Sequence, residues 1–420
     1  MLHHFFFQKV SHGRMPKVIL RSLSSDGMFK NKSNIKAPSL NVSPSWNKTT
    51  PFVLTEYVDI YCFPEIDDRY IVDKDVQITI GDLHANTMKL IFLLVKHQVV
   101  TNITIDDYHH LVQIYEVSTQ DQTKHNLMLF NQIINKMNVN NQAFIRFIGD
   151  EVADRLHNDY FTLCVLLKLQ KHGLPMEIML SNHGIEFIHA YEVQSNFHPI
   201  MLNPEHANSM ANLQLFIEKK WVSLEEINNM IMLAYKPMLK LLSYSFIDNT
   251  GIIIYSHAGI DFNIIEGLSQ MLDTPYHDET LTELSKTIDN INSQFYVHAR
   301  NNTIHTLCQE ENMASAYLGY VDLKKSPFEA LIWNRQYDEL DRPSLHNGFS
   351  VYFIHGHHTD RSMGDHVFNL DNALGKSTFH HEGDYTIILT SSQRLEPGED
   401  QTQKEASLVM TNRLGGHHGP

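Results

Sequence analysis

The fold is decided by the stretch Ile78-Thr79-Ile80-Gly81-Asp82-Leu83-His84-Ala85-Asn86. Apolar and polar residues alternate from Val76 to Ile80, which predicts a half-buried strand. Residues 87–96 (TMKLIFLLVK) carry enough apolar side chains to predict a helix. Asp82 and His84 therefore lie on a strand-to-helix turn. Ligands of open α/β sheets collect outside the carboxyl ends of strands, so this turn is a candidate binding position.

Composition excludes several classes of protein. The 420 residues, 42% of them apolar, can bury a large core in one domain or two. An excess of 48 acidic over 33 basic residues argues against a general nucleic-acid binder. Cys62, Cys164 and Cys308 are odd in number and far apart, which favours a reducing compartment over a disulfide framework. No apolar run reaches the roughly 20 residues that span a bilayer, so we expect a soluble protein without a transmembrane segment.

The chain divides into three parts. Residues 1–50 hold eight basic residues and one acidic residue, which predicts a flexible basic arm or, alternatively, a transit peptide. Residues 51–390 are predicted to form the catalytic domain, with a helical insertion or cap at 97–142 and a mainly helical region at 186–242. Residues 391–420 are predicted to be a flexible polar tail.

Four more predicted strands end in polar turns, at 143–148, 176–180, 251–255 and 351–354, and another strand is predicted at 385–389. The four turns read Gly-Asp-(x)3-Asp-Arg, Ser-Asn-His-Gly, Ser-His-Ala-Gly and Gly-His-His. One such turn would be a helix or turn cap, but five at strand ends predict one α/β site, because a parallel or mixed sheet brings these ends to one edge. Oxygen and nitrogen ligands without a thiolate suit a pair of Mn, Fe or Zn ions.

In this order, over Val76 to Thr359, the motifs resemble those of the calcineurin-like metallophosphoesterases, specifically the phosphoprotein phosphatase group. The Gly-Asp-Leu-His and Gly-Asp-Glu-Val-Ala-Asp-Arg motifs are most similar to the Wip group of secreted bacterial effector phosphatases. The resemblance implies a two-sheet α/β β-sandwich flanked by helices. It also implies secretion by a bacterium into the cytoplasm of a host cell. The acidic tail at 395–405 is compatible with a C-terminal secretion signal and equally with ordinary disordered sequence.

The resemblance implies two divalent metal ions, with Mn expected first and Fe or Zn as alternatives. The implied ligands are Asp82 and His84 for the first ion, Asp150 as the bridge, and Asn182, His257 and His357 for the second. His355 and His358 are rival ligands, and the Gly-His match favours His357. Two cations lower the pKa of a bridging water, and the resulting hydroxide attacks phosphorus.

Four further residues are implied to act on the substrate. His183 would protonate the leaving oxygen, and Asp154 would orient His183. Arg155 would hold the phosphate oxygens, and Arg335 in the short Trp-x-Arg match would be a second clamp. Trp333 itself is expected in the core.

The expected activity is that of a metal-dependent phosphoprotein phosphatase, hydrolysing phosphomonoesters of Ser/Thr or Tyr in proteins, including those of a host cell. Two alternatives stay open: a dinucleoside polyphosphate hydrolase, which shares the Trp-x-Arg element, and a catalytically weak phosphoprotein-binding effector. Ser181 and Gly184 replace a Gly and a Glu of the family pattern, which suggests the second alternative. Two further departures are Ala85, which replaces a Gly, and one extra residue between Asp150 and Asp154. Placing Asp154 behind His183 therefore requires a bulge or a different turn.

Overall fold

The computed structural model describes residues 51–66, 76–247, 249–308, 325–358 and 365–391. The predicted arm at 1–50 and the predicted tail beyond residue 391 lie outside the described residues and stay predictions. Residue 391 itself ends a strand.

The first sheet has six strands in the order β1-β13-β2-β5-β6-β7. Their bounds are β1 Phe52–Asp59, β13 Glu382–Ser391, β2 Val76–Ile80, β5 Phe144–Phe147, β6 Met176–Met179 and β7 Leu239–Lys240. β2, β5, β6 and β7 run parallel, whereas β13 is antiparallel to both β1 and β2. The carboxyl ends of β2, β5 and β6 therefore meet at one edge of this sheet.

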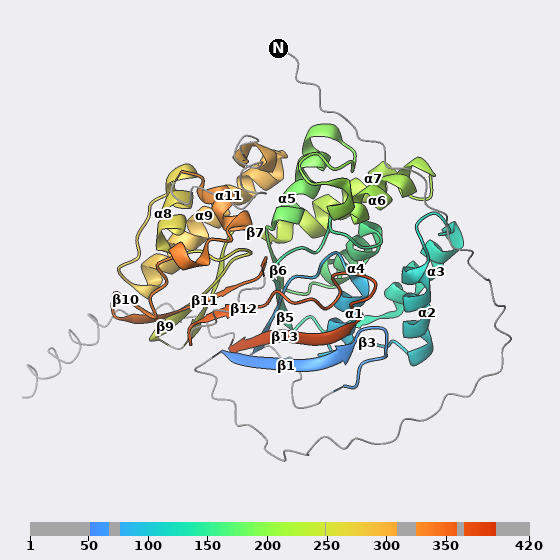
Figure 1. The fold of residues 1–420 in the computed structure, drawn as a ribbon, viewed down its shortest axis with the longest axis horizontal. Helices are drawn as coiled ribbons and strands as arrows, with labels where there is room; N and C mark the ends of the chain where they lie inside the picture. The colour runs from blue at the N-terminus through green and yellow to red at the C-terminus, as the bar shows by residue number, and fades with distance from the viewer. Residues whose placement is uncertain (1–50, 67–75, 248, 309–324, 359–364, 392–420) are drawn as a thin grey trace, which may run out of the picture. The chain divides into compact units, whose positions relative to one another are not determined.

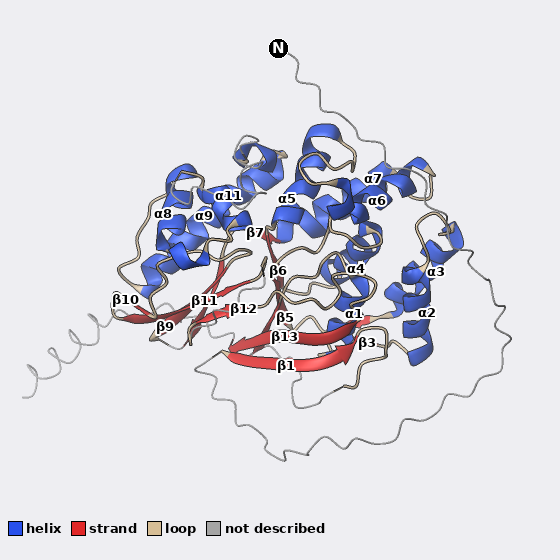
Figure 2. Ribbon diagram, viewed as in Figure 1, coloured by secondary structure: helices blue, strands red, loops and turns tan. Residues whose placement is uncertain are grey.

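The second sheet has the order β10-β11-β9-β8, with β12 paired to β11. Its strands are β8 Ser243–Ile247, β9 Gly251–Tyr255, β10 Leu345–His346, β11 Phe349–His355 and β12 Val367–Asn369. β9, β11 and β12 are parallel. Figure 2 shows the strands of both sheets in red. Side chains join the two sheets: the guanidinium of Arg146 on β5 lies 3.8 Å from the ring centre of Tyr255 on β9. Met179, Ile253 and Ile388 belong to one buried cluster.

Helices cover both sheets (Figure 1). α1 (Thr87–Lys96) and α4 (Asp159–Lys171) lie beside the first sheet, and α2 (Ile105–Glu116) and α3 (Lys124–Lys136) pack against them. The short strands β3 (Val100–Thr101) and β4 (Asn138–Val139) flank this α2–α3 pair. α8 (Phe262–Met271), α9 (Leu281–Asn301) and α11 (Pro327–Trp333) lie on the side of the second sheet.

The segment after β6 is a series of short helices. It contains α5 (Asn182–His189), α6 (Asn208–Glu218) and α7 (Leu224–Met230), with π-helical turns at Ala190–Gln194 and Ile231–Tyr235. Single 3-10 turns occur at Pro204–His206, Lys236–Met238, Ile304–Leu307 and Tyr337–Glu339.

The mixed α/β class predicted from the sequence is confirmed, whereas the particular sandwich of the resembled family stays a prediction. β2, α1 and β9 have the predicted bounds. α4 begins after its predicted cap, because the Asn158 side chain accepts the N–H of Tyr160. β1 and β8 were not predicted. β1 is a half-exposed edge strand, and the Ser-Tyr-Ser start of β8 resembles a turn as much as a strand.

Candidate active site

The polar turns after six strands meet around a cleft of about 170 Å³. β2, β5 and β6 contribute from the first sheet and β9, β11 and β12 from the second. The lining residues are His84, Asp150, Arg155, Asn182, His183, Arg335, His357, His358, Asp371 and Lys376. The remaining three predicted residues, Asp82, Asp154 and His257, are fully buried and contact this lining. The fold thus brings all ten predicted residues together, at the edges of two sheets rather than of one.

Asp82 is buried at the end of β2 and held by the turn after β11. Its Oδ2 accepts the backbone N–H of His357 at 2.7 Å. A Cβ at Gly356 would stand 2.0 Å from Oδ1 of Asp82, so this close approach requires glycine. Within the described part of the chain, Oδ1 itself has no hydrogen-bond partner. Burial, together with Asp371 and Asp150, raises the pKa of Asp82 well above its ordinary value.

The two ring nitrogens of His84 contact different groups. Its Nε2 donates to the carbonyl oxygen of Asn372 at 2.9 Å, and its Nδ1 lies 3.3 Å from Oδ2 of Asp154. Burial alone would lower the pKa of His84, but Asp154 and Asp371 raise it to about 9. His84 has φ 56°, and the site loops hold further left-handed residues at Ala85, Asp150, Ala153 and His357. Such concentrated backbone strain is typical of functional sites.

The turn after β5 carries the extra residue and differs from the expected arrangement. His183 does not lean on Asp154, because its Nδ1 donates to the carbonyl oxygen of Ala153 at 2.6 Å. Oδ1 of Asp154 lies 3.7 Å from Nε2 of His183 and accepts NH1 of Arg155 at 2.6 Å. The left-handed residue Ala153 turns its carbonyl toward His183 and carries Asp154 toward His84. Burial would raise the pKa of Asp154, but His183, His84 and Arg155 hold it well below its ordinary value.

The turn after β6 begins with Ser181, one of the residues that depart from the family motif, which caps the helix α5. The Oγ of Ser181 accepts the N–H of Gly184 at 2.8 Å and starts α5. Beside Gly184 lies Glu151, the residue after Asp150, whose carboxyl hydrogen-bonds the hydroxyl of Tyr235. Glu151 therefore places a carboxyl next to the position from which Gly184 removes one.

Asn182, His257 and His357 form a second group of ligand atoms. Oδ1 of Asn182 lies 2.8 Å from Nε2 of His257 and 3.1 Å from Nδ1 of His357. Nδ1 of His257 is 3.0 Å from the carbonyl oxygen of Ile148, so it carries the proton and Nε2 presents a lone pair. Burial lowers the pKa of His257 and holds that of His357 well below its ordinary value, so both rings are neutral. Of the rivals, His355 bonds outside this group and His358 is exposed.

These atoms fit divalent cations. Many of the unpartnered buried atoms among the described residues lie here: Asp82 Oδ1, His84 Nδ1, Asp150 Oδ1, Asp154 Oδ2, His357 Nε2 and both carboxylate oxygens of Asp371. Acceptors that face one another repel unless a cation lies between them. One ligand atom each from His84, Asp150 and Asp154 falls within a 4.8 Å group. Carboxylate, imidazole and amide donors suit Mn, Fe or Zn.

Two arginines line the cleft, Arg155 and Arg335. Arg155 follows the β5 turn and stays 36% exposed although its NH1 bonds Asp154. Arg335 comes from the end of α11 and lies 5.6 Å from the ring centre of Trp333. Trp333 is buried, as expected of a core residue. Guanidinium groups in these positions can hold phosphate oxygens.

Sequence reasoning missed Asp371 and Lys89. Asp371 follows β12, a strand of only three residues, so its strand-end aspartate carried too weak a signal. Lys89 is buried in the apolar helix α1, and its Nζ donates to the backbone oxygens of Asp82 at 2.6 Å and Leu374 at 2.9 Å. Burial lowers its pKa to about 8. A lysine in an apolar helix gives no sequence sign of such contacts.

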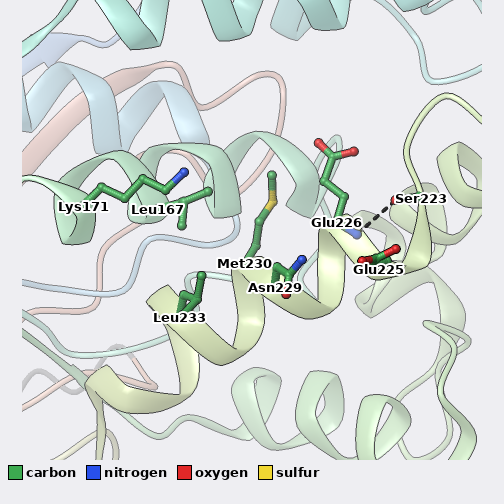
Figure 3. A pocket seen from close by; sticks show the side chains of 8 residues that line it. All are labelled: Leu167, Lys171, Ser223, Glu225, Glu226, Asn229, Met230 and Leu233. Carbon is green, nitrogen blue, oxygen red and sulfur yellow. Dashed lines mark hydrogen bonds between the residues drawn. The ribbon is translucent and has the colours of Figure 1, made fainter.

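A second cleft of about 620 Å³ lies between α4 and the α7 segment (Figure 3). Apolar Leu167, Met230 and Leu233 line it together with Lys171, Ser223, Glu225, Glu226 and Asn229. Ser223 caps α7 by accepting the N–H of Glu226 at 3.0 Å. Among the described residues, no cluster of His, Cys, Asp or Glu side chains that could hold a metal ion lies in this second cleft. The smaller cleft is therefore the candidate active site.

Comparison with known proteins identifies the family. The family model described as WipA-like, phosphatase domain, matches residues 144–376, more than half of the chain. The chain belongs to the WipA-like phosphatase family. The crystal structure of the phosphatase domain from the Legionella effector WipB is 34% identical, with a TM-score of 0.63. That match covers 67% of this WipA-like chain and 99% of the WipB chain.

Other comparisons add little. A cold-active protein-tyrosine phosphatase of Shewanella is 14% identical over 79% of each chain, and its TM-score of 0.34 is too low to indicate a common fold. No curated protein matches the WipA-like chain. In the part of the chain that the structure describes, no helix has the length and apolar character to cross a membrane.

The family finding corrects the interpretation drawn from the motifs. The sequence was interpreted as a calcineurin-like metallophosphoesterase of the phosphoprotein phosphatase group. The model that matches is that of the WipA-like phosphatase domain, and the similar structure is the WipB phosphatase domain, so that wider assignment is withdrawn. Short motifs report the donor atoms that a chemistry needs, and the same donors can be used by different families. Phosphatase activity is the part of the interpretation that the family supports.

Proposed function

We propose that this WipA-like chain is a metal-dependent phosphomonoesterase acting on phosphoproteins. The observation that carries the proposal is the lone pair of His257 Nε2 facing the Asn182 oxygen at 2.8 Å, beside the buried carboxylate of Asp150. With Nδ1 of His257 committed to Ile148, a cation among these acceptors removes the repulsion. The chemistry of the donors supports Mn first, with Fe or Zn as alternatives.

The residues would hold two cations in two groups. Asp82, His84 and Asp154 would hold one, and Asn182, His257 and His357 the other, with Asp150 reaching both. Two divalent cations, when bound, lower the pKa of a shared water and neutralise charge on the phosphoryl oxygens. The hydrogen bonds of His84 to Asn372 and of His257 to Ile148 fix which nitrogen of each ring is available as a ligand.

His183 supplies the proton to the leaving oxygen. Its Nδ1 is fixed on the carbonyl oxygen of Ala153, so the ring presents Nε2 to the cleft. Oδ1 of Asp154 lies 3.7 Å from this Nε2. A positioned histidine of this kind accelerates leaving-group departure by roughly 10²- to 10⁴-fold.

Arg155 and Arg335 bind the phosphate oxygens. Asp154 anchors NH1 of Arg155, which preorganises the guanidinium and leaves its other N–H groups for substrate. Arg335 lines the same cleft. Charge that spreads over the phosphoryl oxygens during transfer is then met by fixed donors.

The phosphoprotein substrate is proposed from the family. The related crystal structure is the phosphatase domain of a Legionella effector, which supports phosphoproteins of a host cell as targets of the present chain. Which of the phosphorylated Ser, Thr or Tyr side chains is preferred is a matter for assay.

The test is hydrolysis of phosphoserine, phosphothreonine and phosphotyrosine peptides with Mn²⁺ and with a chelator. We expect turnover with Mn²⁺, loss with the chelator, and recovery on adding Mn²⁺. Asp150→Asn and His183→Ala should remain folded and lose turnover. Chelator-insensitive hydrolysis would refute the metal dependence, and preferred cleavage of diadenosine tetraphosphate would refute the phosphoprotein substrate. Binding of phosphopeptide without phosphate release would instead indicate a binding effector.

A further inference from the structure

The segment Leu370–Lys376, between β12 and β13, packs against the turn that carries Asp82 and His84. The Leu370 carbonyl would stand 2.1 Å from a Cβ at Gly81, so the two backbones touch. Nδ2 of Asn86 donates to the Gly375 oxygen at 3.2 Å, and Nζ of Lys89 bridges the backbone oxygens of Asp82 and Leu374. These contacts hold the segment in a fixed position beside the candidate metal ligands.

Asp371 projects from this segment into the cleft. Its side chain is 1% exposed, and neither carboxylate oxygen has a hydrogen-bond partner among the residues that the structure describes. Oδ1 lies 3.3 Å from Nε2 of His84. The ring of His84 therefore stands between two carboxylates, with Asp154 at Nδ1 and Asp371 at Nε2.

Packing alone does not explain this carboxylate. A buried charge without hydrogen bonds costs free energy, and Asp82 adds repulsion. Lys376 is 37% exposed with Nζ 3.8 Å from Oδ2, which is a weak contact. Burial would raise the pKa of Asp371, but the ring of His84 first, with Lys376 and Lys89, holds it below its ordinary value. The carboxylate is therefore tied chiefly to His84.

We propose that Asp371 is a positioning residue for His84, an inference that rests on the proposed metal-dependent function. Its negative charge beside the Nε2–H holds the tautomer and orientation in which Nδ1 faces the first cation. The Asn372 carbonyl accepts the hydrogen bond from the same N–H, and Asp371 polarises the ring further, which makes Nδ1 a stronger ligand. Two adjacent residues of one loop thus act on the cation through His84.

The experiment is Mn²⁺ titration by calorimetry, with metal content of the dialysed protein, in wild type and in Asp371→Asn. Loss of such an outer carboxylate typically weakens metal affinity by roughly 10- to 100-fold. We expect that loss for one of two ions, while the ion of the Asn182 group keeps wild-type affinity. Asp371→Glu, which keeps the charge, should recover part of the loss. Asp384→Asn on the exposed face of β13 is the matched control and should bind like wild type.

A structural role predicts different results. If Asp371 serves only as the partner of Lys376, Asp371→Asn and Lys376→Met should lower the melting temperature of the metal-free protein alike and leave both affinities unchanged. Our proposal predicts instead that Asp371→Asn gains less stability from Mn²⁺ than wild type gains. It also predicts that Lys376→Met does not weaken Mn²⁺ binding, because removing a positive charge favours a cation.

The role of Asp371 and the metal-dependent function can be refuted separately. If Asp371→Asn binds two Mn²⁺ ions, both with wild-type affinity, the role of Asp371 is refuted. The metal-dependent function would still stand. A wild-type protein that binds no Mn²⁺ and hydrolyses phosphopeptides in chelator would overturn both.

Discussion

Oδ2 of Asp154 lies 3.3 Å from Nδ1 of His84, so the second aspartate of the β5 turn belongs to the first group of candidate metal ligands. The sequence had placed this aspartate behind His183, a position that the Ala153 carbonyl occupies. The extra residue before Arg155 moves the carboxylate by turning the backbone at Ala153.

Asp154→Asn should therefore weaken Mn²⁺ binding as well as turnover, because one carboxylate of the His84 group loses its charge. We expect at least about 10-fold weaker binding of one ion. Calorimetry and kcat measured on the same preparations provide the check. If Asp154 only oriented His183, kcat would fall while both Mn²⁺ affinities stayed at wild-type values.

Arg335→Ala should reduce kcat/KM for phosphopeptides, since a guanidinium that faces the cleft is removed. The loss of one preorganised donor to transition-state charge costs roughly 10²- to 10³-fold. Arg335→Lys should recover only part, because an ammonium cannot bind two oxygens side by side. Arg300→Ala, in the last turn of α9, removes the same charge away from the cleft and serves as control. Equal kinetics of Arg335→Ala and the control would argue against the clamp.

Gly356→Ala should abolish binding of at least one cation. The new Cβ would meet Oδ1 of Asp82 at 2.0 Å, and the carboxylate would have to leave its position. Gly383→Ala is the control, since its Cβ would make an ordinary 3.8 Å contact with Leu374. Metal content after dialysis separates the two variants. Full metal content in Gly356→Ala would show that Asp82 is not a ligand in the observed position.

Glu151 should make stability fall as pH rises. Burial raises the pKa of this carboxyl from 4.5 to about 8, so the folded protein keeps a proton that the unfolded chain releases above pH 4.5. The stabilising contribution is complete below pH 4.5 and is lost as pH approaches 8. The slope is at most about 1.4 kcal/mol for each pH unit.

Urea unfolding in chelator at pH 5.5 and 7.5 tests this contribution. Glu151→Gln, which carries no titratable proton, should lose less stability than wild type between the two pH values. Exposed Glu279→Gln controls for the loss of a carboxyl group. Parallel losses in Glu151→Gln and wild type would contradict the raised pKa.

Much of the candidate site could be predicted from the sequence because its parts are local. A strand that ends in Gly-Asp-x-His or Ser-Asn-His is visible in a few residues, and parallel strands must present such ends at an edge. The same reasoning could not choose the family, since similar donor sets recur in unrelated phosphatases, and the WipA-like match replaced the wider assignment. It also missed β1, an edge strand with polar residues on its exposed face.

By itself the sequence predicted which ten side chains would form one candidate site, and in which turns they stand. Only the tertiary structure decided that two sheet edges share them, that Asp154 turns to His84, and that Asp371 and Lys89 belong to the same cluster. The reason is physical. Residue type and strand end are local properties, whereas the partner of a buried carboxylate depends on backbone turns and on distant segments: Oδ2 of Asp82 accepts the N–H of His357, 275 residues away.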